Sequence, residues 1–375
     1  ELFKNNLNLV IFNPSKKNLK IREKIIPELK KIYDKYWPAI KTSKAISDNQ
    51  KILEAYNQKL TENSLTMLGL VTKGGQGLAT GNNGDFVGCL EGTIEAKRVY
   101  KHRPIKIFEL IRNKKNFLKK FKEFSKFGNM NKVEKYLESI SEEKIRNYFF
   151  KIKEEFGRDV FGQGFLYRII RKEEITEVKD LSEKEKNEGI NKEKKIYIKY
   201  DKGDKKGNRW YFETPYYLKW DKRSVLHYQT DERARWQGYD FFFKAGFCWS
   251  DVHTVYLKCR LKEKGVNDVS SMSLININKK IDDKYIVGLI NSKFIAEFQE
   301  NFLNNTSHLQ MNDARKLPVI VPSKKKLQEF IDLFDEAKKI KLAYFKNKIS
   351  EEEQEKKLGK IQAKVDLEVE KLYNL

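Results

Sequence analysis

Cysteine and histidine are scarce in this chain, which has three cysteines and four histidines among 375 residues. Cys89, Cys248 and Cys259 form no CxxC pair, which argues against a disulfide scaffold or a cysteine zinc site and predicts thiols packed in a core. The histidines lie far apart in sequence without an i,i+4 histidine partner, so no ligand set for a metal hydrolase is visible. We therefore expect no metal site.

Long apolar runs are absent as well. No segment approaches the ~20 apolar residues of a membrane-spanning helix, and no signal peptide opens the chain. Together with the sparse cysteines, these absences predict a cytoplasmic protein with no membrane partner. The chain opens on Glu1 without an initiator methionine, which predicts that it is a piece of a longer protein.

The sequence motifs of cofactor-binding loops are also missing. There is no GxxxxGK[ST], and the glycines Gly157, Gly162 and Gly164 do not have GxGxxG spacing. Nuclease-like carboxylate and lysine pairs occur at Asp201–Lys202 and Asp240–Lys244, but such pairs arise by chance when 34% of residues are charged. We predict no catalytic residue and no bound cofactor within this chain.

Basic charge and aromatic residues, in contrast, are abundant. Lysine and arginine number 76 against 53 acidic residues, a formal net charge of +23. An aromatic content of 13% argues against disorder despite the high charge. A folded protein with this surplus is expected to bind a polyanion, and nucleic acid is the first candidate.

Hydrophobic periodicity predicts an α+β fold in three segments. Residues 1–64 are predicted to be helical and to form the tail or an insertion of a catalytic domain. Residues 65–322 form a mixed or antiparallel β domain with a helical insertion at about 104–191, whose charged end, 179–195, is predicted to be an exposed loop. Residues 323–375 form a C-terminal helical hairpin.

The two terminal segments carry distinct helix signals. A strand-like run at residues 7–12 precedes the first helical pattern, which is predicted to start near Pro27 because proline cannot donate to a helical ladder. In the hairpin, Ser350 is predicted to cap the second helix ahead of three glutamates. The hairpin either packs on the body, which we favour, or forms a dimerising coiled coil.

A glycine- and asparagine-rich run at 74–87 is the most distinctive local feature. Glycine permits positive φ angles and a close backbone approach, while threonine and asparagine supply short polar groups. The run therefore suits a loop that meets a ligand. A β-hairpin turned by Asn82-Asn83-Gly84 explains the same residues equally well.

A second feature is a segment at 205–236 in which basic and aromatic residues alternate. Its cations can neutralise phosphates, arginine can also fork onto guanine edges, and aromatic rings can stack on bases. The alternative is that about half of these aromatic residues are core, surrounded by solvated lysines. The candidates for DNA contact in this segment are Lys205, Lys206, Arg209, Trp210, Arg223, Arg233 and Arg235.

Four further stretches of the sequence carry recognisable patterns, and they span the chain from about residue 65. They are Gln76–Val87, Phe242–Asp251, Val287–Phe294 and Asn304–Pro322. Together, and in this order, they resemble segments of adenine-specific DNA methyltransferases of type II and fused type IIG restriction–modification systems.

The resemblance implies a target recognition domain that binds double-stranded DNA. In that family, S-adenosyl-L-methionine and an Asn-Pro-Pro-Tyr/Phe catalytic motif belong to an upstream domain. Here Asn13-Pro14 is followed by Ser15, and the motif occurs nowhere. A catalytic methyltransferase domain or subunit, carrying the cofactor, is therefore expected as a partner outside this chain.

The resemblance also implies roles for particular residues. Residues 80–83 would face the DNA cleft, and Trp249 and Ser250 would anchor the domain. A polar turn near the DNA would contain Asn305, Thr306, Ser307, Gln310 and Asn312. With Lys73, Gln76, Thr80, Asn82 and Asn83 and the basic and aromatic candidates above, these form the predicted DNA-binding set.

Two other functions are compatible with the sequence. One is an autonomous specificity subunit like those of type I systems, although only one recognition unit is visible here. The other is an RNA-binding protein, which the charge permits but for which no RRM or KH signature appears.

Overall fold

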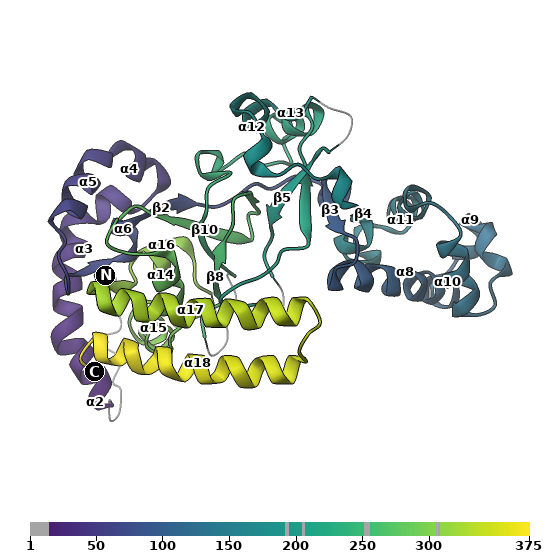
Figure 1. Cartoon of the computed structure of the whole chain (residues 1–375). Helices are drawn as coiled ribbons and strands as arrows, with labels where there is room; N and C mark the ends of the chain where they lie inside the picture. The colour runs from purple at the N-terminus through teal and green to yellow at the C-terminus, as the bar shows by residue number, and fades with distance from the viewer. Residues whose placement is uncertain (1–14, 192–194, 205–206, 251–255, 305, 307) are drawn as a thin grey trace. The chain divides into compact units, whose positions relative to one another are not determined.

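The computed structural model describes residues 15–191, 195–204, 207–250, 256–304, 306 and 308–375, and confirms the α+β class (Figure 1). The strand-like run at 7–12 lies outside these residues. The chain forms two compact units. Unit 1 joins the chain up to Leu78 with Asp201–Glu213 and Gln237–Leu375, and unit 2 joins Ala79–Tyr200 with Thr214–Trp236.

The compact units cross the predicted segment boundaries at residues 64 and 322. The helices that precede residue 64 and the C-terminal hairpin share one hydrophobic core with the strands of unit 1. Hydrophobic periodicity shows where helical patterns give way to strand-like ones, but it does not show which segments pack together. The assignment of the three segments to functional domains stays a prediction.

Unit 1 contains a four-stranded antiparallel sheet in the order β2-β10-β7-β8. Side-chain alternation directs Phe247 and Trp249 of β7 to the core face, where Leu274 and Met272 of β10 are their cross-strand partners. A separate antiparallel pair joins β1 to β11. The strands are β1 Leu65–Met67, β2 Thr72–Gly75, β7 Gly246–Ser250, β8 Cys259–Lys262, β9 Val266–Asn267, β10 Ser271–Asn276 and β11 Pro318–Ile320.

The N-terminal helices of unit 1 begin before Pro27. A π-helical turn at Ile21–Ile25 leads directly into α3, Ile26–Ile40, and the residues at the join, Ile25 and Ile26, both have helical backbone angles. Helical structure therefore runs through Pro27, and the predicted start near Pro27 is wrong; the wider π-helical turn that precedes α3 is where the regular α-helical ladder is interrupted. The other helices of this part are α2 Lys16–Lys20, α4 Ser43–Asp48, α5 Gln50–Lys59 and α6 Leu68–Val71.

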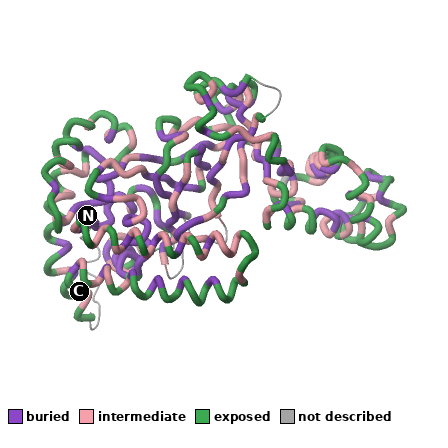
Figure 2. Tube along the Cα trace, viewed as in Figure 1, coloured by how far each residue is buried: buried purple, intermediate pink, exposed green. Residues whose placement is uncertain are grey.

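The C-terminal hairpin consists of α17, Lys324–Phe345, and α18, Glu351–Leu372. Ser350 caps α18 as predicted, because its side chain accepts a hydrogen bond from the Glu353 N–H (3.1 Å). Buried positions recur along both helices between exposed ones (Figure 2). The apolar ones are Phe330, Phe334, Ala337, Leu358, Ile361, Val365 and Val369, and the polar ones are Lys341, Gln354 and Gln362.

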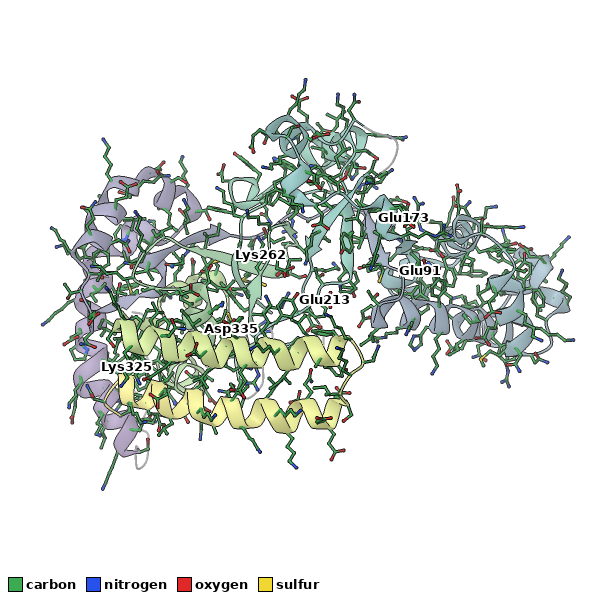
Figure 3. The ribbon with its side chains drawn as sticks, viewed as in Figure 1. Glu91, Glu173, Glu213, Lys262, Lys325 and Asp335 are labelled. Carbon is green, nitrogen blue, oxygen red and sulfur yellow. The ribbon has the colours of Figure 1, made fainter. Side chains whose placement is uncertain are left out.

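The hairpin packs on the other helices of unit 1. Its buried residues share a core with α14, Asp283–Ile290, and α15, Lys293–Phe298. Asp335 of α17, labelled in Figure 3, accepts a hydrogen bond from Lys284 of α14 (2.8 Å). Since the apolar face of the hairpin is already covered, the structure favours packing on the body over a dimerising coil.

One buried lysine in the hairpin predicts a stabilising substitution. Burial lowers the pKa of Lys341 to about 8. Its ammonium donates a hydrogen bond to Asn208 Oδ1 and lies 5.1 Å from the centroid of the Phe345 ring. We expect Lys341→Met to raise the free energy of unfolding at pH 7 by ~1–3 kcal/mol, because the folded state no longer desolvates a cation. The gain should be constant below pH 8 and shrink as the pH rises towards 10.5, where the unfolded wild-type lysine also loses its proton.

Urea denaturation between pH 7 and 10.5 measures this gain. Lys339→Met is the matched control, because Lys339 is exposed on the same helix and should change stability by less than ~0.5 kcal/mol. A loss of stability in Lys341→Met at pH 7 would show that the hydrogen bond to Asn208 outweighs the desolvation.

Unit 2 contains strands paired in the order β4-β3-β6-β5, with β3 parallel to β4 and antiparallel to β6. These mixed pairings fit the predicted fold class. The strands are β3 Val87–Leu90, β4 Arg168–Ile170, β5 Tyr197–Asp201 and β6 Tyr216–Lys219. Helix α13, Lys222–Thr230, follows β6.

The helical insertion of unit 2 starts earlier than predicted. Helix α8 begins at Ile94, capped by Thr93, and continues through Pro104, so residue 104 lies inside a helix. The region predicted as an exposed loop at 179–195 contains α12, Glu183–Glu188, because Ser182 and Glu185 form a capping box. The insertion also contains α9 Phe117–Lys120, η2 Lys122–Lys126, α10 Met130–Glu138 and α11 Glu142–Phe156.

Candidate nucleic-acid interface

The glycine- and asparagine-rich run forms a braced loop and not a β-hairpin. Its flanking strands do not pair with each other, because β2 pairs with β10 and β3 pairs with β4 and β6. Within unit 2, Thr80 Oγ1 donates to Asn83 Oδ1 (2.8 Å) and the Asn82 amide donates to Asp85. Asn83–Phe86 then forms the short helix α7. The hairpin alternative is therefore wrong.

Two side chains from elsewhere in unit 2 hold this loop in place. His227 Nε2 lies 2.9 Å from the Thr80 carbonyl oxygen, and its ring stacks on Phe86 with centroids 4.5 Å apart. Arg146 of α11 donates to the Gly84 carbonyl (2.7 Å), and burial lowers the pKa of this arginine. Both contacts are to backbone oxygens, so they fix the path of the loop and leave the side chains of Asn82 and Asp85 at the surface.

The loop lies against the segment that carries two of the predicted arginines. The backbones of Ala79 and Arg235 exchange hydrogen bonds of 2.8 and 3.2 Å. Gly81 has φ +73°, and a Cβ there would lie 3.0 Å from the Ala234 nitrogen. Glycine thus permits both the turn and the close approach. We call residues 80–85 and 231–235 together the junction surface.

The junction surface carries exposed guanidinium groups in a defined orientation. The Arg233 side chain is 71% exposed, and it forks onto Asp231 through Nε (3.0 Å) and Nη2 (2.9 Å). These hydrogen bonds from Arg233 hold the pKa of the Asp231 carboxyl well below its usual range. Arg235 is exposed beside it, and Arg223 is exposed on α13.

The structure brings together five of the predicted site residues in unit 2. They are Thr80, Asn82, Asn83, Arg233 and Arg235. The prediction that Thr80 contacts DNA is wrong. Thr80 is only 2% exposed, and its hydroxyl donates to Asn83, so it stabilises the loop from within. In unit 1, Lys73 is half-buried on β2, and the exposed Gln76 accepts a weak hydrogen bond from Gln237 (3.4 Å).

Arg209 and Trp210 are the clearest corrections to the predicted DNA-binding set. Arg209 donates to Gln362 of α18 (2.9 Å) and lies 4.4 Å above the Tyr256 ring, and burial lowers the pKa of this arginine. Trp210 is 1% exposed in the core of unit 1. Trp210 cannot stack on a base because its ring is buried, and the guanidinium of Arg209 is already bonded to α18. Both residues therefore stabilise the packing of the C-terminal hairpin and do not contact DNA.

The predicted polar turn before α16, Met311–Arg315, is organised by a buried glutamine that the sequence did not single out. The Gln299 amide, 0% exposed, donates to the carbonyl oxygens of Asn304 (2.8 Å) and Thr306 (3.3 Å). Of the predicted residues in this turn, Thr306, Gln310 and Asn312 are exposed. The predicted residues Lys205, Lys206, Asn305 and Ser307 lie outside the described part of the chain.

Trp249 has the position expected of an anchor. Its ring is fully buried and its indole N–H donates to the Leu309 carbonyl (2.8 Å), which ties β7 to the end of the polar turn. All three cysteines are buried free thiols, as predicted. Ser250 ends β7, and its side chain lies outside the described part of the chain.

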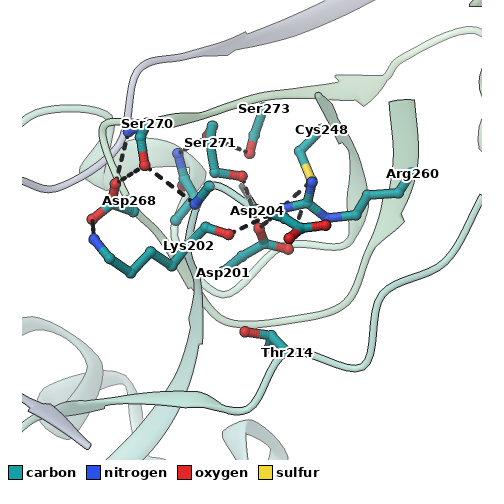
Figure 4. Close-up of polar contacts among 12 residues, drawn as sticks. Asp201, Lys202, Asp204, Thr214, Cys248, Arg260, Asp268, Ser270, Ser271 and Ser273 are labelled. Carbon is teal, nitrogen blue, oxygen red and sulfur yellow. Dashed lines mark hydrogen bonds and ion pairs between the residues drawn. The ribbon is translucent and has the colours of Figure 1, made fainter. Parts of the chain in front are cut away.

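The nuclease-like pairs belong to structural networks. In unit 1, the Asp201 carboxylate accepts hydrogen bonds from Arg260 Nη2 (2.8 Å) and Ser271 Oγ (2.7 Å), while Lys202 pairs with Asp268 (3.0 Å), as Figure 4 shows. Lys244 donates to the backbone oxygen of Asp240 (2.6 Å). Each pair is thus explained by its packing.

No metal-ligand cluster of three or more His, Cys, Asp or Glu side chains occurs among the described residues. In the same part of the chain, every helix is too short or too polar to cross a bilayer. Comparison with protein-family models and with curated proteins finds no match to the chain. The family resemblance therefore rests on its four sequence stretches.

Proposed function

We propose that this chain is a sequence-specific double-stranded DNA recognition module. It would position a target adenine for an adenine-specific methyltransferase domain or subunit outside these residues, which would also bind S-adenosyl-L-methionine. The observation that carries the proposal is the junction surface. There, two features that lie about 150 residues apart in sequence meet through the backbone hydrogen bonds of Ala79 and Arg235.

The chemistry of this surface suits base reading in a groove. Arginine presents a planar fork of donors that matches the O6 and N7 acceptors of guanine. Arg233 and Arg235 are exposed on a loop whose backbone is fixed, so little ordering entropy is lost on binding. The two hydrogen bonds to Asp231 fix the orientation of the Arg233 guanidinium before DNA arrives.

Selection of bound duplexes from a random library tests the proposal. We expect the wild-type chain to enrich a consensus sequence. Arg233→Ala and Arg235→Ala should each lose ~1–3 kcal/mol of discrimination at one base pair, because each removes a forked contact to a base edge. The matched control is Arg171→Ala, which removes an arginine side chain of unit 2 that is 75% exposed and lies outside the junction surface.

The outcomes separate the alternatives. If wild-type protein enriches no duplex consensus, or prefers RNA, the proposal fails. If both arginine variants recover the wild-type consensus, base reading does not occur at the junction surface, and the exposed polar turn at Thr306, Gln310 and Asn312 becomes the better candidate.

A further inference from the structure

The positive charge of the helical part of unit 2 is concentrated in one short segment. Residues 112–126 contain seven basic residues and one acidic residue, a net charge of +6. Residues 130–156, which form α10 and α11, contain six of each and are neutral. We call residues 112–126 the basic segment. Its cations are Arg112, Lys114, Lys115, Lys119, Lys120, Lys122 and Lys126.

The fold forces these cations outward. Phe117, Phe121 and Phe124, spaced four and three residues apart, are all less than 5% exposed and pack in one core with Phe149. The rings of Phe117 and Phe121 stack with centroids 5.0 Å apart. Because the aromatic residues occupy the inner face, all seven basic side chains are exposed. Figure 3 shows long side chains that end in nitrogen projecting from the part of unit 2 that contains α9.

Among the described residues, few carboxylates or aromatic rings contact these cations. Lys120 pairs with Glu155 (3.0 Å), while Lys114 and Lys126 lie over the rings of Phe156 and Phe127. Among the residues that the structure describes, no carboxylate lies within ion-pair distance of Lys115, Lys119 or Lys122. Like charges this close repel one another, and a polyanion relieves that repulsion.

We infer that the basic segment binds the phosphate backbone of the duplex beside the recognised bases, an inference that rests on the proposed function. Six of the seven cations are lysines, which bind phosphate as point charges and lack the planar fork that reads a base edge. Helix α8, with 20 residues, is ~30 Å long and separates the segment from β3. Its contacts therefore fall on flanking phosphates and carry no sequence information.

The test neutralises three unpaired lysines together, in Lys115→Gln/Lys119→Gln/Lys122→Gln. The matched control is Lys132→Gln/Lys135→Gln/Lys151→Gln, which removes the same charge from exposed positions of the neutral helices α10 and α11. Binding to a long and a short duplex carrying the selected consensus is measured at several salt concentrations. The short duplex ends at the recognised bases.

On the long duplex, we expect the slope of log affinity against log salt to fall by about 3 in the basic-segment variant and by less than 1 in the control. The consensus should be unchanged, and the short duplex should bind wild type and variant equally. Thermal unfolding of each variant checks that the exposed substitutions leave the fold intact.

If wild-type protein binds the long duplex and the basic-segment variant keeps the wild-type slope, this inference is overturned while the proposed function stands. A changed consensus would also overturn it, because phosphate contacts do not select bases. If wild-type protein binds no duplex, the proposed function fails first.

Discussion

We expect Asp201→Ala to lower the free energy of unfolding by ~3–5 kcal/mol, because it leaves a buried cation without its counter-charge. Arg260 is 0% exposed, and Asp201 is its carboxylate partner at 2.8 Å (Figure 4). Within the described part of the chain, two further guanidinium nitrogens of Arg260, Nε and Nη1, already have no hydrogen-bond partner. Burial raises the pKa of the neighbouring Cys248 thiol to about 12, so the thiol stays neutral and cannot replace the carboxylate.

Chemical denaturation of the variant measures this loss. Asp332→Ala is the matched control, because Asp332 is exposed on α17 and should change stability by less than ~0.5 kcal/mol. The double variant Asp201→Leu/Arg260→Met should recover most of the stability, since it removes both buried charges. A loss below ~1 kcal/mol in Asp201→Ala would show that water or another group compensates Arg260.

The second large effect concerns salt. We expect the affinity of the chain for duplex DNA to fall by ~10³–10⁵ between 50 and 200 mM salt, the range for a protein that contacts 6–10 phosphates. The net charge of +23 and the exposed cations of the junction surface and the basic segment support a contact of this size. Fluorescence anisotropy with a labelled duplex measures it. Salt-independent binding, or none at low salt, would contradict a nucleic-acid function.

The parts of the fold that depend on local sequence could be predicted. The α+β class, the C-terminal hairpin and the Ser350 cap follow from periodicity and from capping chemistry within one or two turns. The start of α8 could not be predicted, because a proline such as Pro104 usually marks a helix boundary. The buried Arg103 beside it donates to the carbonyl oxygens of Phe165 (3.1 Å) and Tyr167 (2.9 Å), a tertiary contact that no local pattern reports.

The candidate site was harder to predict, because exposed and buried arginines and tryptophans look the same in a sequence. Arg209 and Arg233 belong to one basic and aromatic segment, yet Arg209 is bonded to Gln362 and Arg233 is exposed. The distinction depends on α18, which follows about 150 residues later. Arg146 was missed for the same reason, since it binds the backbone oxygen of Gly84, which lies 62 residues earlier in the sequence. Gln299 was missed although its partners Asn304 and Thr306 are only a few residues away, because the irregular path of that turn is not visible in the sequence.

The pairing of Ala79 with Arg235 has a consequence for how such a protein could change its target. Both hydrogen bonds join main-chain atoms, so the geometry of the junction surface does not depend on which side chain residue 235 carries. Gly81, in contrast, has a positive φ, and a Cβ at this position would displace the backbone of Arg233 and Ala234. If the junction surface reads bases as proposed, a fixed backbone with replaceable side chains would let single substitutions change the recognised sequence while the fold is retained. Residues 233 and 235 would then be the positions to randomise in order to retarget the protein.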